Sequence, residues 1–376
     1  MRIGIMTFWE SKNNYGQILQ LFALQKIVGD LGHNPFLIRY KRIPIPYKSE
    51  NFVVNFKIKL KNFLKFIYTT IRGLFVKKKL ANDEKRKFEE FKKKYIVSEG
   101  SDYLDYKDLI KKPPVADVYI VGSDQVWNNN FSVSAEAFLL GFGNNKIKRI
   151  AYAASFGQKK LSDKTNQLFN KYIQNFNSVS VREESGVDIC MDLKVSNPEW
   201  VLDPTLLFTK EDWIKMLELP DIKEEQKSIF IYTLGNSKIL DKDKFIGYAN
   251  SLKDYKVVHA SANSDDSGNV LPTIPEWVNY IKNAELVITT SFHGMVFCIL
   301  NNTNFIVLPN TGHAEGMNER IYSVLTLLNL EEHMIESFSE KTVSNIFSKK
   351  IDWNSINNIL ENKRKFSIEF LKNAIN

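Results

Sequence analysis

The first candidate for proton-transfer chemistry is His293, which follows Ser291 in the stretch ELVITTSFHGMVFCIL (residues 285–300). Apolar runs on either side of this pair predict a buried strand, a polar turn and a helix. Ser291 is then the expected N-cap, with His293 in the first helical turn. Backbone N–H groups at a helix start attract phosphate or carboxylate, and an imidazole there can move protons on the bound anion. The alternative is a packed or cap-supporting histidine, and this segment alone leaves both open.

A second candidate site follows the strand predicted over residues 117–122 (DVYIVG). Polar residues and a tryptophan stand in the loop after it: Ser123, Asp124, Gln125 and Trp127. Open α/β sheets bind ligands in the loops at the carboxyl ends of their parallel strands. We therefore expect this loop to contact a substrate. An aspartate that only caps the loop explains Asp124 equally well.

Two weaker signals come from other segments. Arg182 ends the strand predicted over 178–182, a position that favours anion binding, although an isolated arginine is more often part of a surface ion pair. Asn14 and Gly16 belong to a loop that resembles a phosphate-binding turn. This loop has one glycine where a dinucleotide-binding fingerprint needs three, so a plain turn is favoured over a phosphate site.

The elements that position these residues alternate as in an α/β protein. Strands are predicted near the start of the chain and again from residue 228 onward, each series interleaved with helices. At 376 residues the chain is long for one core. We expect an N-terminal Rossmann-like domain over 1–206 and a C-terminal one over 207–376, with the final helices returning to the first.

Composition excludes several classes of protein. Two cysteines, Cys190 and Cys298, give neither a disulfide framework nor a metal-binding spacing, which suits a reducing cytosol. Met1 leads directly into a predicted strand, so no signal peptide is expected. No apolar stretch is long enough to span a bilayer. We expect a cytoplasmic protein that binds no nucleic acid.

The net charge of +8 is concentrated in one segment. Residues 57–94 hold fourteen Lys or Arg and four Asp or Glu, a local charge of +10. We expect a basic amphipathic helical insertion over about 53–96. An aromatic-rich apolar stripe beside a lysine face can lie on an anionic membrane surface. The alternative is a helix that packs on the body of the protein with its lysines in solvent.

The chain contains, in this order, the phrases NNYGQILQLFALQ, DVYIVGSDQVWN, RIAYAASFG, VSVREESG, VLDPTLL and ITTSFHGMVFCIL. Together they resemble the polysaccharide pyruvyl transferase family, from Arg2 to about Leu330. The resemblance implies a GT-B-like fold, in which two Rossmann-like domains face a cleft. It also implies transfer of pyruvate from phosphoenolpyruvate to two hydroxyls of a sugar as a ketal, with Arg182 and His293 acting at the donor and with no metal or other cofactor.

This sequence departs from the family pattern at two positions. Ser291 stands where some members carry arginine, and Thr290 stands where aspartate is frequent. Without an arginine at position 291, other groups must supply one contact to the anion. Without an aspartate at position 290, a carboxylate that could orient the site is missing. We expect Ser291, helix-terminal N–H groups and Arg320 to hold the second anionic group. The alternative for Arg320 is an ordinary place on a helix surface.

Two further expectations concern the acceptor. Asp124 is expected to contact an acceptor hydroxyl or to act as its base. The acceptor is expected to be a sugar of a capsular or exopolysaccharide repeat unit, free or polyprenyl-linked, with contact to the inner face of an anionic membrane. Two other functions stay open, a GT-B-like glycosyltransferase that uses a nucleotide sugar and a non-catalytic member of the family.

Overall fold

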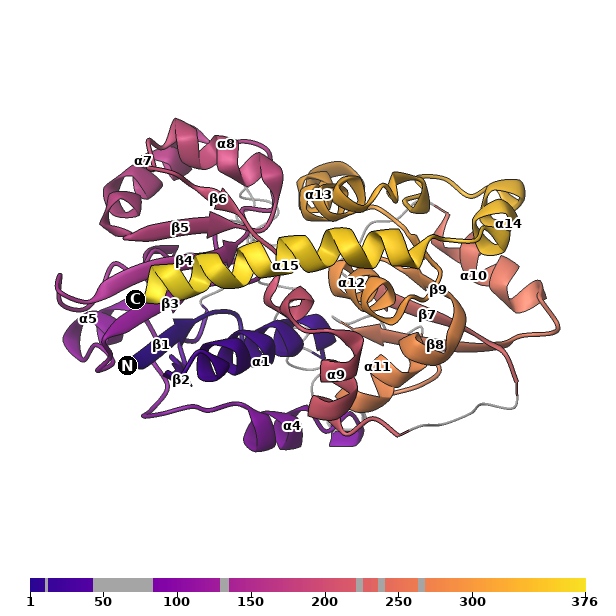
Figure 1. Cartoon of the computed structure of the whole chain (residues 1–376), viewed down its shortest axis with the longest axis horizontal. Helices are drawn as coiled ribbons and strands as arrows, with labels where there is room; N and C mark the ends of the chain where they lie inside the picture. Colours follow the sequence, from indigo (N-terminus) through magenta and orange to yellow (C-terminus); the bar gives the residue numbers. More distant parts are fainter. Residues whose placement is uncertain (11–12, 43–83, 129–134, 221–225, 236–240, 263–267) are drawn as a thin grey trace, which may run out of the picture.

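The computed structural model describes residues 1–10, 13–42, 84–128, 135–220, 226–235, 241–262 and 268–376. The chain forms two parallel sheets, each flanked by helices (Figure 1). The first sheet has the strand order β2-β1-β3-β4-β5-β6. Its strands are β1 (Arg2–Met6), β2 (Asn34–Leu37), β3 (Val118–Val121), β4 (Lys148–Ala154), β5 (Ser178–Val181) and β6 (Glu199–Trp200).

The second sheet has the order β10-β9-β7-β8, and all its strand pairs are parallel. Its strands are β7 (Ser228–Leu234), β8 (Lys256–Ala262), β9 (Ala284–Thr289) and β10 (Phe305–Val307). The predicted boundary at residue 206 falls in the short η2 helix (Pro204–Leu207) between the sheets. The α/β class expected from the sequence, with one parallel sheet in each half, is confirmed.

Helices cover both sheets (Figure 1). Those before residue 220 are α1 (Tyr15–Asp30), α4 (Phe88–Tyr95), α5 (Tyr106–Lys111), α6 (Ala135–Phe138), α7 (Asp163–Tyr172), α8 (Glu184–Asp192) and α9 (Lys210–Leu217), with η1 (Ile173–Asn175). Those after it are α10 (Lys242–Ser251), α11 (Ile274–Asn283), α12 (Phe292–Asn301), α13 (Glu319–Leu328), α14 (Glu340–Ser348) and α15 (Trp353–Ile375), with η3 (Gly312–Asn318) and η4 (Glu331–His333).

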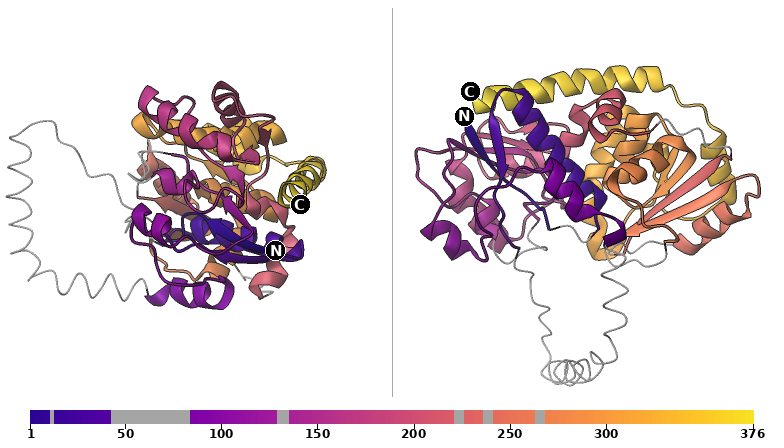
Figure 2. Two further views of the ribbon diagram at one scale, coloured as in Figure 1. Left: turned by 90° about the vertical axis from the view of Figure 1, so that its left-hand side faces the viewer. Right: turned by 90° about the horizontal axis from the view of Figure 1, so that it is seen from below.

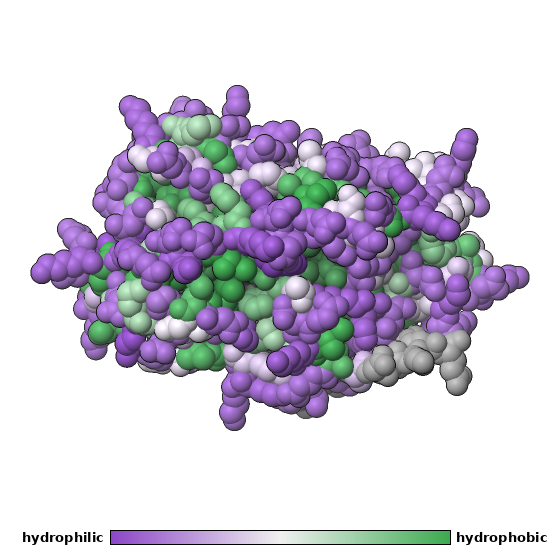
Figure 3. All heavy atoms as spheres, viewed as in Figure 1, coloured by the Kyte–Doolittle hydropathy of each residue, from purple (hydrophilic) through white to green (hydrophobic). Residues whose placement is uncertain are grey.

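Helix α15 runs from the second sheet back along the first (Figures 1 and 2). The Leu202 N–H donates to Ser367 Oγ at 3.0 Å, and Lys148 Nζ donates to the Ile375 carbonyl at 3.1 Å. Figure 3 shows its polar side chains crossing this face as a ridge, with hydrophobic residues on either side. The last helix therefore packs on both halves of the molecule.

The two halves also share one hydrophobic core, into which α1 inserts its first residue. Tyr15 stacks on Trp277 with ring centres 5.2 Å apart and meets Tyr232 edge-on at 5.6 Å. Its hydroxyl donates to the Pro272 carbonyl at 2.6 Å. Tyr15 belongs to the first half and its partners to the second, and all three rings are buried. The core cluster that contains them extends through both halves.

Most of the basic segment predicted to bind membranes, including residues 53–80, lies outside the described residues. The described part is α4, which buries Phe91 against Phe22 of α1. On its exposed side Lys92 pairs with Glu89, and Lys94 with Glu218. Among the helices that the structure describes, none combines the length and apolar character that crossing a bilayer requires.

We predict that Tyr15→Ala lowers the free energy of unfolding by about 3–5 kcal/mol, because it empties a buried aromatic site in the shared core. Tyr15→Phe removes only the hydroxyl bond and should cost about 1 kcal/mol. Urea denaturation followed by circular dichroism measures both. Phe366→Ala is the control, since Phe366 is exposed on α15. Equal losses for Tyr15→Ala and the control would contradict a shared core.

Candidate active site

The carboxyl end of β5 places Arg182 at the junction between the two halves. The residue is 1% exposed, and its Nη1 donates to Asp203 Oδ2 at 2.8 Å. Its Nη2 lies 3.5 Å from Asp124 Oδ1, and the guanidinium carbon lies 4.6 Å from the centre of the Phe292 ring. Burial by itself would lower the pKa of Arg182, but Asp203 and Asp124 raise it above its usual value. Arg182 is therefore a buried cation held between two carboxylates.

Asp203 is the residue on which the other polar groups converge. Its Oδ2 accepts from Arg182 and from Ser123 Oγ at 2.9 Å, and it lies 3.5 Å from His293 Nε2. Its Oδ1 accepts from the N–H and the hydroxyl of Thr205 at 3.0 and 2.6 Å. Burial would raise the pKa of Asp203, but His293, Arg182 and Thr205 hold it well below its usual value. The carboxylate stays ionised although it is buried.

The sequence did not identify Asp203 as a site residue. It precedes a proline near the predicted end of the first domain, and no strand or helix predicted beside it marks it as functional. The available signal was its place in the phrase VLDPTLL, one of the six that carry the family resemblance. Its carboxylate stands beside the imidazole of His293, so the orienting group that Thr290 does not supply comes from residue 203. The side chain of Thr290 instead accepts from the Leu234 N–H at 3.0 Å.

Helix α12 begins as predicted, with Ser291 as its N-cap and His293 in its first turn. Ser291 Oγ accepts from the Gly294 N–H at 3.2 Å. The imidazole is buried, with 5% of the residue exposed, and lies against the N-terminus of α1. A Cβ at Gly16 would stand 2.1 Å from His293 Nδ1. Gly16 is therefore required to give the imidazole room. Its neighbour Asn14 is the N-cap of α1, its side chain accepting from the backbone N–H of the third residue after it.

Arg320 of α13 joins the same cluster from the second half. Its Nη1 lies 3.7 Å from Asp124 Oδ1, and its guanidinium carbon lies 5.4 Å from the centre of the Phe292 ring. With the Gln125 amide oxygen turned toward it, that oxygen accepts from Nη1 at 2.7 Å and from Nη2 at 3.2 Å. Burial and the neighbouring Arg182 lower the pKa of Arg320 to about 10. Arg320 is only 9% exposed, so the alternative of an ordinary position on a helix surface is wrong.

Several donors in this cluster make no hydrogen bond within the described part of the chain. They are Nε and Nη2 of Arg182, Nε of Arg320 and Nε2 of His293, all buried. Buried donors are normally paired in native proteins, so each exception needs an explanation, such as a catalytic role or a bound ion. An anion with several oxygens would satisfy donors arranged in this way. Among the described residues, no group of three or more His, Cys, Asp or Glu is placed to hold a metal ion.

The structure changes the interpretation of the loop after β3. Trp127, expected at a ligand, is buried in the core: its ring packs against Phe156 and Phe169, and its N–H donates to the Phe138 carbonyl at 3.0 Å. A large aromatic ring beside a predicted strand is usually part of the core, and that rule applies here.

Asp124 is placed between two guanidiniums. Burial would raise its pKa, but Arg182, Arg320 and His293 lower it, so Asp124 is a weak base.

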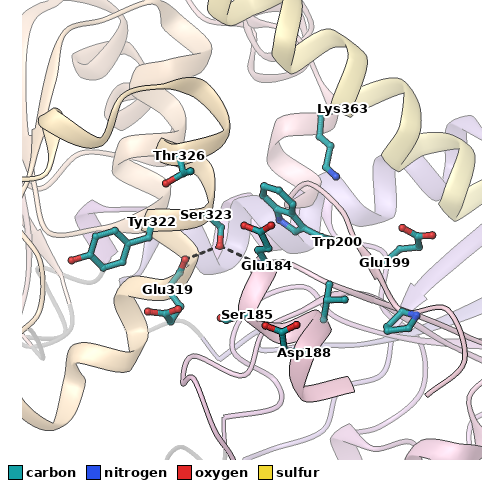
Figure 4. Close-up of a pocket in the computed structure, with 12 residues that line it drawn as sticks. Glu184, Ser185, Asp188, Glu199, Trp200, Glu319, Tyr322, Ser323, Thr326 and Lys363 are labelled. Carbon is teal, nitrogen blue, oxygen red and sulfur yellow. Dashed lines mark hydrogen bonds between the residues drawn. The ribbon is translucent and has the colours of Figure 1, made fainter. Parts of the chain in front are cut away.

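A surface pocket of about 560 Å³ lies on the other side of the contact between α8 and α13. Figure 4 shows Glu184, Asp188 and Trp200 gathered around it, with Lys363 reaching in from α15. Ser323 Oγ joins the two helices there, accepting from the Glu184 N–H and donating to a carbonyl of its own helix. Carboxylates of α8, β6 and α13 line the pocket, with Lys363 as its one basic lining residue. Like charges repel, so an anionic ligand suits the buried cluster and not this pocket.

The fold is GT-B-like, and the buried polar cluster lies at the junction of its two halves. The profile of one family, described as polysaccharide pyruvyl transferase, matches residues 14–312. The chain therefore belongs to the polysaccharide pyruvyl transferase family. No curated protein matches the sequence.

Solved structures resemble the fold at low sequence identity. The UDP-GlcNAc 2-epimerase of Methanocaldococcus jannaschii, in complex with UDP-GlcNAc and UDP, aligns with a TM-score of 0.51 and 12% identity over 96% of this chain and 99% of that one. The enzyme of the same name from Neisseria meningitidis, bound to UDP-GlcNAc, aligns with a TM-score of 0.49 and 9% identity over 99% of each chain. At these identities the likeness concerns the fold alone.

We predict that Asp203→Asn lowers the free energy of unfolding by about 3–5 kcal/mol, because it leaves Arg182 as a buried charge without its closest partner. The depressed pKa of Asp203 stabilises the fold above about pH 4, where an ordinary aspartate ionises, and this stabilisation is lost as the pH falls through the depressed value. Asp203→Asn should therefore flatten the acid limb of the stability curve. Urea unfolding at several pH values tests this, with the exposed Asp192→Asn as control. Parallel acid limbs for wild type and Asp203→Asn would refute the assignment.

A second prediction concerns the contact between α1 and α12. Gly16→Ala should displace the His293 imidazole, because the added Cβ overlaps the ring. Long-range ¹H–¹⁵N spectra of the five histidines report this as a shift of one imidazole signal, assigned with His293→Gln. Gly29→Ala in the same helix is the matched control, since nothing lies within 4 Å of its Cβ. An unchanged His293 signal in Gly16→Ala would show that the imidazole is not held there.

Proposed function

We propose that this protein transfers the pyruvyl group of phosphoenolpyruvate to a pair of sugar hydroxyls and forms a ketal. The observation that carries the proposal is the convergence of Arg182, Arg320 and His293 in one buried cluster of a member of this family. These residues come from separate segments and from both halves of the chain. Nε of Arg182 and Nε of Arg320 are buried and make no hydrogen bond within the described residues, so they can bind a ligand.

The two arginines suit the two anionic groups of the donor. Phosphoenolpyruvate carries a carboxylate and a phosphate, and a guanidinium binds either group through two parallel hydrogen bonds. The Ser291 side chain and the N–H groups at the start of α12 add neutral donors on the same side as His293. In this arrangement Arg320 supplies the second cation that an arginine at position 291 would otherwise bring.

His293 is the residue proposed to move the proton. Ketal formation adds a proton to the methylene carbon of the donor, and one sugar hydroxyl bonds to carbon-2. Phosphate then leaves with the electrons of its C–O bond as the second hydroxyl attacks, and the two hydroxyl protons are released. Histidine has an intrinsic pKa suited to these transfers. The carboxylate of Asp203 lies 3.5 Å from Nε2 and holds the imidazole in place at the donor site.

The acceptor that we propose is a sugar of a capsular or exopolysaccharide repeat unit, free or polyprenyl-linked. Family membership supports a polysaccharide acceptor as a class. A polyprenyl-linked acceptor would place the enzyme at the inner face of a membrane. The segment expected to make that contact, with Phe63, Ile67 and Ile71 on its apolar stripe, lies outside the described residues.

Calorimetry with phosphoenolpyruvate tests the donor, with UDP-GlcNAc as the comparison ligand. We expect binding of phosphoenolpyruvate alone in the wild-type protein. Binding of UDP-GlcNAc alone would favour a nucleotide-sugar enzyme, and binding of neither would favour a non-catalytic member. Released phosphate and the mass of the product, measured with candidate free and lipid-linked sugars, then identify the acceptor.

Two variants should separate binding from chemistry. Arg182→Lys keeps the buried charge but loses the planar fork, so donor affinity should fall by on the order of 1.5–3 kcal/mol. His293→Gln should still bind the donor, while turnover falls by about 10²–10⁴-fold, as expected for a lost acid or base. Circular dichroism confirms that each variant is folded. Wild-type turnover in His293→Gln would remove this histidine from the mechanism.

A further inference from the structure

Glu183 is a buried carboxyl group that the proposed mechanism does not use. The residue is 0% exposed and stands directly after Arg182. It occupies the N-cap position of α8, yet its side chain makes no cap hydrogen bond. Glutamate at a helix start ordinarily faces the free N–H groups of its own helix. Here the carboxyl group turns away from α8 and toward the loop after β4.

One oxygen of this carboxyl group holds the loop after β4. Oε1 accepts from Ser155 Oγ at 3.1 Å, from the Phe156 N–H at 2.6 Å and from the Gly157 N–H at 3.1 Å. A Cβ at Gly157 would overlap the end of the Gln125 side chain, so this loop packs tightly against the amide that faces Arg320. Glu183 therefore positions the surroundings of the second arginine through the loop.

The other oxygen, Oε2, is buried and has no hydrogen-bond partner in the part of the chain that the structure describes. Charged neighbours that act on Glu183 are Arg182 from β5 and Arg320 from α13. Cys190 on α8 is a titratable neighbour whose own pKa is raised by burial and by Glu183. The loop after β4 contributes neutral donors only.

The charges of the cluster explain what Oε2 can do. Arg182 and Arg320 contribute two positive charges, which Asp124 and Asp203 already balance, because the pKa of each aspartate is lowered. An ionised Glu183 therefore leaves the cluster without a net positive charge before any ligand arrives. Phosphoenolpyruvate bound at Arg182 and Arg320 would add further negative charge beside it. Like charges in a low-dielectric site raise the pKa of the carboxylate among them.

We propose that Glu183 takes up a proton when the anionic donor binds and releases it when phosphate leaves. The proton comes from solvent and forms an O–H bond at Oε2, while Oε1 keeps its three hydrogen bonds, and no other bond forms or breaks. This inference rests on the proposed function, since it concerns the same donor site. It assigns Glu183 as a positioning residue whose charge adjusts to the donor.

Glu183 is the carboxyl group best suited to this role. Burial raises its pKa, and the opposing effect of Arg182 and of its three hydrogen bonds does not reverse that rise. Asp203 is held by Arg182 and by both donors of Thr205, and Asp124 lies between two guanidiniums. Both aspartates would lose ion pairs on protonation, whereas Glu183 has an oxygen with no partner to lose.

The experiment is calorimetric titration with phosphoenolpyruvate in buffers of different ionisation enthalpy, which counts the protons taken up on binding. The wild type should take up more protons than Glu183→Gln, by about one per donor bound. Glu183→Gln keeps a carbonyl oxygen for the three loop hydrogen bonds and is neutral at every pH. Glu184→Gln, one residue further on and exposed at the outer pocket, is the matched control and should behave as wild type.

The pH dependence of affinity gives a second reading. Binding coupled to the uptake of one proton weakens tenfold for each pH unit above the pKa of the free group. Wild-type affinity should show this slope, and Glu183→Gln should lack it and bind more tightly than wild type at alkaline pH. Any proton taken up by the His293 imidazole would still be counted in Glu183→Gln and would be lost in His293→Gln.

Three outcomes are distinct. Absence of phosphoenolpyruvate binding in the wild type refutes the proposed function. Binding with equal proton uptake in wild type and Glu183→Gln, at every pH, overturns the role of Glu183 and leaves the donor assignment intact. If Glu183→Gln does not fold, the wild type and His293→Gln still test the role of Glu183. Proton uptake that disappears completely in His293→Gln would overturn that role.

Discussion

The structure depends on keeping one buried carboxylate, Asp203, fully paired. Its oxygens accept from Arg182, Ser123 and Thr205 and stand beside His293, so it links the carboxyl ends of β3 and β5 to the start of α12. A buried ionised group is tolerated only when its hydrogen bonds and countercharges are in place. The same contacts therefore hold the two halves of the chain together and set the geometry of the reactive groups.

Helix starts and strand ends were predictable because they are local. The alternation of apolar runs predicted the parallel strands, and Ser291 and Asn14 cap α12 and α1 because their side chains reach N–H groups three residues away. Arg182 was recognised as a candidate because it ends a strand. The family resemblance added His293 to the donor site, which the local pattern alone left undecided.

What the sequence did not predict depends on contacts between distant segments. Asp203 was not recognised as a site residue because nothing nearby in the chain indicates that Arg182 and His293 lie beside it. Trp127 was expected at a ligand because a loop tryptophan is ambiguous until the surrounding aromatic residues are placed. The steric need for Gly16 arises from a histidine on the other half of the chain. Glu183 was passed over because a glutamate at a helix start is usually explained by the helix itself.

Helix α15 has a consequence for folding during synthesis. Its 23 residues follow the second half in the chain, yet Phe370 packs on Tyr152 of β4 and the helix bonds to Leu202 and Lys148 of the first half. Domains made early ordinarily fold as units while the rest of the chain is still being added. Here the first half gains these contacts only after the second half has been made, so its native packing depends on a segment synthesised later.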